Sequence, residues 1–470
     1  MNFLTRKISI VKLTLIFILI TQLLVIFNIK PWKNADQKNA LINWDVTSYY
    51  SYLPAIFVHK DLRFEFLNNS KINYAEKHQF WPETAPNGNK VIKTTMGMSV
   101  LYFPFFVISH IYSLINDKVV ANGFSKPYEI GLTFSSIFYM MIGLFFLAKV
   151  LKSLYEDKKV SMLLVLVILG TNLFYYATTE PCMSHVYTFS LASIFMYVTM
   201  EIFQKNSWKF FIFLGLISGL LFLVRPTNIL FIIAFLLYKI ENFSSIKKRL
   251  YWFIQHYKKL IIATIIAFLI VSVQFLYWKW ATGNWFFNSY IGEQFYFNQP
   301  RILEFLFSYR KGWLVYTPIF FMSLLGLYKM YIRKNPWFIP ILIMLPVIVY
   351  LFSSWWCWWF GGGFGMRPMI DYYPLLIIPL GEILRTKIFY KKYIISFILG
   401  GFVSLNLFQT LQKRNGVIHW DSMSKESYWA FFTTIKMEKA EDWKRQEVLL
   451  KSPNYNKARN GKLEYDFEVY

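Results

Sequence analysis

The chain reads WWCWWFGGGFGMRP from Trp355 to Pro368, between two long apolar runs. Tryptophan faces suit the C–H surfaces of a sugar ring, and the indole N–H can donate to a hydroxyl. Glycines let the backbone approach a ligand closely, and Arg367 offers a planar fork to a phosphate. The stretch therefore favours a site for a phosphorylated, sugar-like ligand where water meets lipid. The alternative is an interfacial aromatic belt with a Gly-rich turn, which explains the tryptophans but not the glycines before Arg367.

Composition predicts the fold class. The 470 residues are 56% hydrophobic and 21% aromatic, whereas soluble domains are roughly 45–50% apolar. The apolar residues form unbroken runs without alternation, so we expect membrane-spanning helices and not a barrel. The net charge of +24 could indicate nucleic acid, but Lys and Arg form short clusters between apolar runs, as the positive-inside rule predicts. The sequence thus predicts an all-α polytopic membrane protein with no nucleic-acid partner.

The distribution of charge also predicts the topology. The first apolar run, about residues 8–29, is expected to be a retained signal-anchor with a cytoplasmic N-terminus. The run 98–115 is ambiguous, because a proline and a histidine interrupt it. If it spans, every later basic cluster falls outside; if it lies on or re-enters the outer surface, all of them fall inside. The positive-inside rule favours the second arrangement.

This topology predicts about eleven transmembrane helices, with a range of about 10 to 13, in the cytoplasmic membrane. Residues 30–127 would form a large outer loop with juxtamembrane helices, and residues 411–470 a polar tail or small cap outside. The expected spans lie near residues 8–29, 128–148, 160–177, 186–203, 208–224, 226–240, 260–280, 313–330, 336–352, 370–384 and 392–410.

Two acidic residues stand out on the expected outer face, where a carboxylate near the membrane needs a partner or a function. Asp45 follows the first helix and is flanked by Trp44 and Tyr49, and Glu180 lies in a short loop just before His185. Either acid could be a general base toward an acceptor hydroxyl, or with His185 a ligand of a divalent ion. The alternatives are a solvated loop acid or helix cap for Asp45, a helix-end charge for Glu180 and a satisfied interfacial histidine for His185.

Basic residues on the outer face oppose the positive-inside bias and so need a reason. Lys93 precedes TTMG, Arg225 lies in the turn VRPTN, and Arg367 belongs to the central stretch. Together they could hold the phosphate of a lipid-linked donor; the alternative for each is anchoring to anionic headgroups. The side chains expected to contact the sugar or the acceptor are Trp44, Tyr49, His185, Trp358 and Trp359.

Several kinds of chemistry are excluded by the sequence. It contains no Walker-type phosphate loop, no Gly-x-Ser-x-Gly elbow and no His-Glu-x-x-His motif. A donor would therefore be membrane-borne. The two cysteines, Cys182 and Cys357, fall in expected outer loops and could form a disulfide.

The layout resembles the GT-C superfamily of integral membrane glycosyltransferases, near its protein O-mannosyltransferase and lipid A aminoarabinose transferase branch. Its members have a first helix followed by a large outer loop with an essential aspartate and juxtamembrane helices, which NWD at 43–45 and YYSYLPAIF at 49–57 match. LVRPTN at 223–228 and the pattern from Trp359 through Arg367-Pro368 to Pro374 look like two later motifs. KTTMGM at 93–98 looks like a Lys-x-Pro-Pro segment but lacks both prolines.

This resemblance implies a polyprenyl-phosphate-linked sugar as donor, a glycan, lipid or protein as acceptor, and transfer on the periplasmic face. Asp45 would be the base and Glu180 a metal or acceptor contact, while Lys93, Arg225 and Arg367 would neutralise the donor phosphate. Residues 1–410 would form the transmembrane catalytic domain. The competing functions are a flippase of a lipid-linked saccharide, although no internal repeat is visible, and a non-catalytic subunit of a cell-envelope complex.

Overall fold

The computed structural model describes residues 8–35, 37, 40–68, 74–80, 82–385 and 389–461. The N-terminal residues 1–7, which the predicted topology places in the cytoplasm, and the last residues of the predicted tail, 462–470, lie outside the described residues. Within this described part, six helices are long and apolar enough to cross a membrane, which confirms the predicted all-α polytopic membrane protein. They fall in α1 (Ile10–Ile29), α5 (Gly97–Ile115), α6 (Lys126–Lys152), α9 (Ser184–Lys205), α13 (Tyr257–Thr282) and α20 (Phe389–Arg414).

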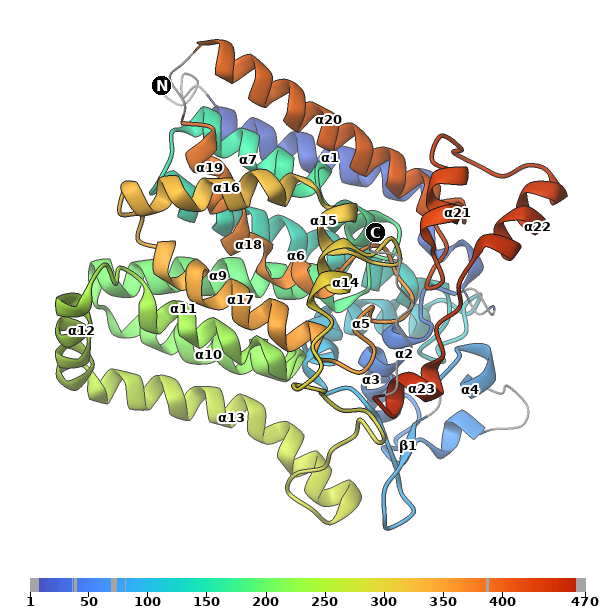
Figure 1. Ribbon diagram of the computed structural model, residues 1–470. Helices are drawn as coiled ribbons and strands as arrows, with labels where there is room; N and C mark the ends of the chain where they lie inside the picture. The colour runs from blue at the N-terminus through green and yellow to red at the C-terminus, as the bar shows by residue number, and fades with distance from the viewer. Residues whose placement is uncertain are drawn as a thin grey trace, which may run out of the picture.

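Shorter helices complete the bundle, and Figure 1 shows them beside the long ones. Close packing joins α10 to α13, α6 to α9 and α16 to α19. These shorter elements are α7 (Asp157–Leu169), α8 (Leu173–Thr178), α10 (Trp208–Val224), η3 (Pro226–Leu230), α11 (Phe231–Leu237), α12 (Phe243–Gln255), α14 (Ile302–Phe307), α15 (Trp313–Tyr316), α16 (Ile319–Ile332), α17 (Phe338–Ser353), η4 (Arg367–Tyr372), α18 (Tyr373–Leu376) and α19 (Ile378–Ile383).

The loops whose sequences carry the basic clusters lie at one end of the bundle, on the left in Figure 1. The ammonium of Lys259 donates to the carbonyl of Asn206 at 2.6 Å. Arg333 donates to the buried carboxylate of Glu382, which also accepts from the hydroxyl of Tyr155 at 3.1 Å. Loops that are far apart in sequence therefore meet at this end, and α1 begins there too (Figure 1). This is the arrangement that the predicted topology requires.

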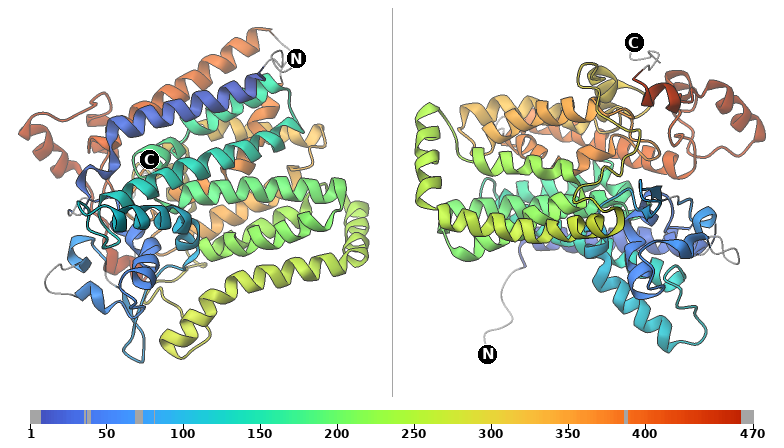
Figure 2. Two further views of the ribbon diagram at one scale, coloured as in Figure 1. Left: turned by 180° about the vertical axis from the view of Figure 1, so that it is seen from behind. Right: turned by 90° about the horizontal axis from the view of Figure 1, so that it is seen from below.

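Helix α5 lies at the end of the bundle opposite the basic loops. The hydroxyl of Tyr139 donates to the carbonyl of Leu101 at 3.2 Å, and His110 Nδ1 lies 2.6 Å from the hydroxyl of Tyr128. The helix thus runs antiparallel to the first half of α6 and does not reach the basic end. In the right-hand view of Figure 2, α5 (cyan) runs obliquely to the long helices. Its internal proline does not interrupt it, so the expected interruption is absent, although the run still does not carry the chain across the bundle.

The polar segments lie at this same end, on the right in Figure 1. The segment between α1 and α5 contributes η1 (Pro31–Asn34), α2 (Asp45–Tyr50), α3 (Tyr52–Phe57), η2 (Glu65–Asn68), α4 (Tyr74–Lys77) and the antiparallel strands β1 (Glu83–Thr84) and β2 (Lys90–Val91). The C-terminal part contributes α21 (Lys425–Ala430), α22 (Ala440–Leu449) and α23 (Tyr455–Arg459). Arg310 holds that part by donating to the carbonyls of Asp421 at 2.8 Å and Lys451 at 2.9 Å.

Two expected spans are broken into short helices. The span 160–177 divides into α7 and α8, and the span 370–384 into η4, α18 and α19. Asn172, between α7 and α8, donates to the carbonyl of Phe364 at 3.0 Å and accepts from the hydroxyl of Tyr373 at 2.7 Å. A polar side chain at the break thus joins these two segments to the central stretch. The hydropathy of the sequence alone predicts unbroken helices here.

The crossing of α16 over α19 depends on Gly326. A Cβ at this position would lie 1.9 Å from the carbonyl oxygen of Pro379. We expect Gly326→Ala to destabilise the protein by about 1–3 kcal/mol, as overpacking does, measured as a lower thermal midpoint of the detergent-solubilised protein. Gly400→Ala in α20 is the matched control, because nothing lies within 4 Å of its new methyl group. Equal midpoints for the two variants would contradict the tight crossing.

Candidate functional site

Asp45 and Arg367 form an ion pair at the end of the bundle that carries the polar segments. The carboxylate Oδ2 of Asp45 lies 2.8 Å from Nη2 of Arg367. Asp45 is the first residue of α2, and Arg367 is the first residue of η4. The Asp45 side chain is 45% exposed, whereas that of Arg367 is 15% exposed. An accessible carboxylate therefore faces a largely buried guanidinium.

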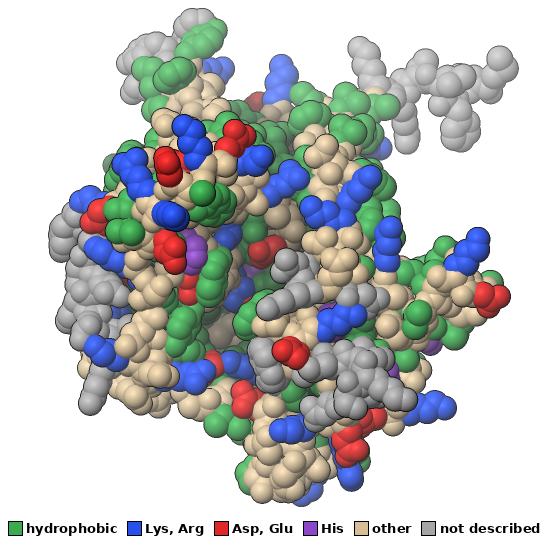
Figure 3. Space-filling model, turned by 90° about the vertical axis from the view of Figure 1, so that its right-hand side faces the viewer, with side chains coloured by type: hydrophobic (Ala, Val, Ile, Leu, Met, Phe, Trp, Pro, Cys, Tyr) green, Lys and Arg blue, Asp and Glu red, His purple; other side chains and the backbone are tan. Residues whose placement is uncertain are grey.

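The predicted charged residues lie close enough to act on one another. Burial alone would raise the pKa of the Asp45 carboxyl, but the positive charges of Arg367, Lys93 and Arg225 outweigh burial and hold this pKa below its usual value. The negative charge of Glu180 in turn helps to raise the pKa of the Arg367 guanidinium. The fold thus brings together five residues from the segment between α1 and α5, the α8–α9 loop, the α10–η3 turn and the central stretch. Figure 3 shows this end, where basic and acidic side chains surround a hollow.

A second carboxylate, Asp371, is wholly buried behind this group. Its Oδ2 accepts from Nη1 of Arg225 at 3.1 Å, and its Oδ1 accepts from the hydroxyl of Thr188 at 2.8 Å and lies 3.2 Å from Nδ1 of His185. The sequence reasoning missed Asp371, because it placed residue 371 inside the span 370–384. The available signal was an acid at the edge of an apolar run, which is costly in a membrane unless it has a partner.

We expect this network to couple Asp371 and Arg225 energetically. Asp371→Ala should cost about 3–5 kcal/mol, because it leaves the Arg225 guanidinium without its anion in a poorly hydrated site. The double variant with Arg225→Gln should recover part of that loss, since the second change removes the unpaired charge. Thermal unfolding of the two single variants and the double variant measures the coupling. If the stability loss of the double variant equals the sum of the losses of the two single variants, the ion pair between Asp371 and Arg225 is contradicted.

The donor set predicted for a divalent ion is not assembled here. Glu180 accepts from the hydroxyl of Tyr175 at 2.7 Å, Asp45 faces an arginine, and His185 faces a buried aspartate. Over the whole described part of the chain, no three His, Cys, Asp or Glu side chains gather as a metal site would require. The residues do not fit a metal ion in this arrangement, and no step proposed below uses one. Cys182 and Cys357 are both free and buried, so the suggested disulfide is absent.

Lys93 is held at the edge of the group by an acid from another loop. Its ammonium forms an ion pair with the carboxylate of Glu293 and lies 5.0 Å from the ring centre of Tyr290. Arg459 of α23 approaches the same carboxylate at 4.0 Å. The C-terminal part therefore reaches the rim of the charged group.

The aromatic residues predicted to bind sugar divide into covered and accessible ones. Trp358 and Trp359 are buried, and the ring of Trp359 packs 5.6 Å from that of Tyr455 in α23. Tyr455 thus covers Trp359, and the role of Trp358 and Trp359 as sugar contacts stays a prediction. Tyr49 is buried and accepts from Ser184 at 3.4 Å. Trp44, beside Asp45, is 62% exposed and is the accessible ring of the predicted set.

Gly363 of the central stretch allows a close contact within the protein. Gly363 has φ +147, and a Cβ there would lie 2.5 Å from the hydroxyl of Tyr176. The next residue, Phe364, donates its N–H to that hydroxyl at 2.8 Å. The stretch is thus fastened to α8 just before Arg367. The close approach expected for a ligand is made by a tyrosine of the chain itself, and it fixes the position of Arg367.

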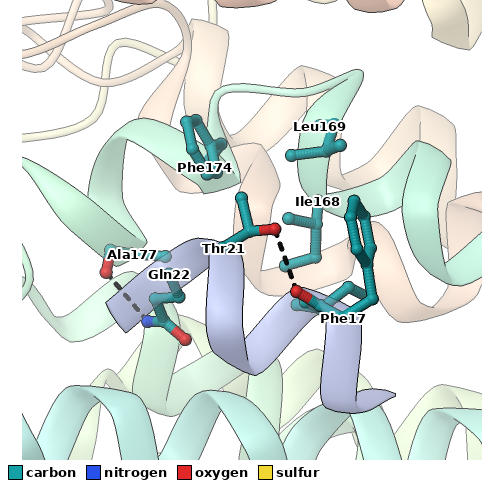
Figure 4. Close-up of a pocket in the computed structure, with 8 residues that line it drawn as sticks. Phe17, Thr21, Gln22, Ile168, Leu169, Phe174 and Ala177 are labelled. Carbon is teal, nitrogen blue, oxygen red and sulfur yellow. Dashed lines mark hydrogen bonds between the residues drawn. The ribbon is translucent and has the colours of Figure 1, made fainter. Parts of the chain in front are cut away.

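An apolar hollow between α1, α7 and α8 is separate from this site (Figure 4). Its lining includes Phe17, Ile168 and Phe174, and the side-chain amide N–H of Gln22 donates to the carbonyl of Ala177 at 2.9 Å. The hollow carries no charged side chain. It therefore offers nothing for acid–base chemistry or phosphate binding.

The fold and the site together define a polytopic membrane protein with an ionised carboxylate and several cations at one end of its helix bundle. Residues 118–278 match the family model for dolichyl-phosphate-mannose-protein mannosyltransferase. The match supports a membrane glycosyltransferase of the GT-C superfamily, which confirms the resemblance noted in the sequence. It covers about a third of the chain and includes Glu180, His185 and Arg225, whereas Asp45 and Arg367 lie outside it. No curated protein matches the chain.

Proposed function

We propose that the protein transfers a sugar from a polyprenyl-phosphate donor to an acceptor hydroxyl of a glycan, lipid or protein, at the outer face of the cytoplasmic membrane. The observation that carries this proposal is the pair of Asp45 and Arg367, in which an accessible carboxylate stays ionised beside a guanidinium. Such a pair combines a proton acceptor with an anion-binding group, and sugar transfer from a phosphate needs both.

Asp45 is the proposed general base. Its exposed carboxylate takes the proton of the acceptor hydroxyl as that oxygen forms a bond to the anomeric carbon of the sugar. The bond from the anomeric carbon to the phosphate oxygen breaks, and its electron pair leaves with the polyprenyl phosphate. The exposed ring of Trp44 next to Asp45 suits the C–H face of a sugar at this position.

The cations stabilise the leaving phosphate. Negative charge grows on the phosphate as the sugar departs, and preorganised cations act most strongly where charge develops. Arg367 can bind two phosphate oxygens through its planar fork. Arg225 is held in place by Asp371, and Lys93 by Glu293. Their positions around Asp45 support a donor phosphate beside the base.

The distribution of basic residues supports an outer-face site. The clusters joined by Lys259, Arg333 and their partners lie at the end opposite the Asp45–Arg367 pair. Lys and Arg are enriched in cytoplasmic loops. This distribution of charge therefore supports a site on the periplasmic side.

A transfer assay in reconstituted bilayers tests the proposal. Purified protein is given a panel of radiolabelled polyprenyl-phosphate sugars together with envelope extract. We expect label from one donor to move into the extract, with release of polyprenyl phosphate. A second panel contains the same sugars linked to polyprenol through a diphosphate. If the protein transfers sugar from these diphosphates and not from the monophosphates, the proposed donor class is wrong.

A further inference from the structure

Helix α12 lies at the end of the bundle opposite the proposed site and has no part in it. Asn242 caps the helix: its side chain accepts from the N–H of Ser245 at 3.0 Å, and the Ser245 hydroxyl accepts from the N–H of Asn242 at 2.9 Å. This capping box fixes where the helix begins. Figures 1 and 2 show α12 lying crosswise to the long helices, between the ends of α11 and α13. Such an orientation places α12 along the plane of a membrane that the bundle crosses.

One face of α12 fastens it to the bundle. The ring of Trp252 packs 4.7 Å from that of Phe203 in α9, and Phe253 packs 6.2 Å from Phe235 in α11. The guanidinium of Arg249 lies 3.8 Å from the ring centre of Phe203. These contacts fix the rotation of the helix about its own axis, so that its other faces have defined directions.

A second face presents an apolar stripe away from the bundle. Ile246, Leu250 and Ile254 recur every four residues and therefore share one side of the helix. Their exposed fractions are 39%, 57% and 69%. Three large aliphatic side chains in a row, on a helix that already has its protein contacts, need an apolar surrounding outside the chain.

The charged residues on the exposed surface of α12 are all basic. Lys247 and Lys248 are exposed, and the helix sequence FSSIKKRLYWFIQ has no acidic residue. Lys258 and Lys259 follow at the start of α13. An apolar stripe bordered by lysines is the pattern of helices that lie in the interface of an anionic membrane.

We propose that α12 is an in-plane helix that binds the anionic phospholipids of the leaflet opposite the active site. The stripe of Ile246, Leu250 and Ile254 enters the boundary between headgroups and acyl chains, and Lys247 and Lys248 contact the lipid phosphates. The charge complementarity selects an anionic lipid surface as the occupant of this stripe. The inference does not depend on the proposed glycosyl transfer.

Spin labels on neighbouring residues test the orientation. Ile254→Cys and Gln255→Cys place labels on the stripe and on the adjacent side of the same helix turn, while the native cysteines are buried. The full-length protein is reconstituted in nanodiscs of phosphatidylglycerol and phosphatidylcholine. We expect the label at 254 to be relaxed mainly by oxygen and the label at 255 mainly by a water-soluble nickel chelate. Nickel access at both positions would overturn the proposal and point to a protein partner instead.

Lipid charge is tested separately with the lysines. We expect phosphatidylglycerol to raise the thermal midpoint of the wild type, and Lys247→Gln/Lys248→Gln to lose about half of that rise or more. Lys118→Gln/Lys126→Gln is the matched control, since it removes the same charge at the other end of the bundle, and it should keep the rise. An undiminished rise in the Lys247/Lys248 variant would overturn the headgroup contact.

Discussion

Asp45→Asn lowers the rate constant for sugar transfer about 10²–10⁴-fold, the usual contribution of a general base. The amide has nearly the same shape and can still accept from Arg367, but it cannot take a proton from the acceptor. Because the carboxylate is half exposed, its ion pair adds little to stability, and the thermal midpoint should stay close to that of the wild type. Single-turnover transfer from the identified donor measures the effect.

Asp117→Asn is the matched control for this change. Asp117 is an exposed acid in the same outer segment, so its loss removes one negative charge from the same face without touching the pair. We expect the control to transfer at the wild-type rate. Full activity of Asp45→Asn would remove Asp45 from the role of base.

Arg367→Lys should reduce kcat/KM about 10²–10³-fold, in the range seen when one preorganised donor is removed from a developing charge. The ammonium keeps the positive charge but lacks the planar fork that binds two phosphate oxygens. Arg367→Gln removes the charge as well and should lose more. Initial rates at several donor concentrations separate the effect on kcat from that on KM.

The pH dependence of Arg367→Gln gives an independent test of the pair. Arg367 is the strongest of the charges that lower the pKa of Asp45, so its removal raises this pKa. A base works only when ionised, and the acid limb of the kcat/KM profile therefore moves to higher pH in the variant. Arg63→Gln, an exposed arginine of the first outer loop, should leave the limb where it is. If the acid limb of the kcat/KM profile stays at the same pH in Arg367→Gln, the charge of Arg367 does not set the pKa of Asp45.

Several residues of the candidate site can be predicted from the sequence. The free-energy cost of a charge near the membrane and the predicted topology together limit which charged residues need an explanation. Acids near the membrane need a partner or a function, and basic residues on the predicted outer face oppose the positive-inside bias. Asp45, Lys93, Arg225 and Arg367 stand out on that ground alone. The structure adds that their charges act on one another across long sequence separations.

The remainder depends on contacts that a hydropathy pattern does not contain. Asp371 is hidden in a run that the pattern assigns to a span, and its pairing with Arg225 appears only when η4 packs against α9. Trp358 and Trp359 are buried, and Tyr455 of α23 packs on Trp359 from a distant part of the chain. Single-sequence reasoning identifies which groups need a partner and not which partner they find.

The most direct test of the central claim is the stoichiometry of one turnover in sealed proteoliposomes that carry a doubly labelled polyprenyl-phosphate sugar. The account predicts that each sugar transferred to acceptor on the side of the Asp45–Arg367 pair leaves one free polyprenyl phosphate. Sugar that reaches the opposite leaflet still attached to its lipid, with no free polyprenyl phosphate, would contradict it and identify a flippase.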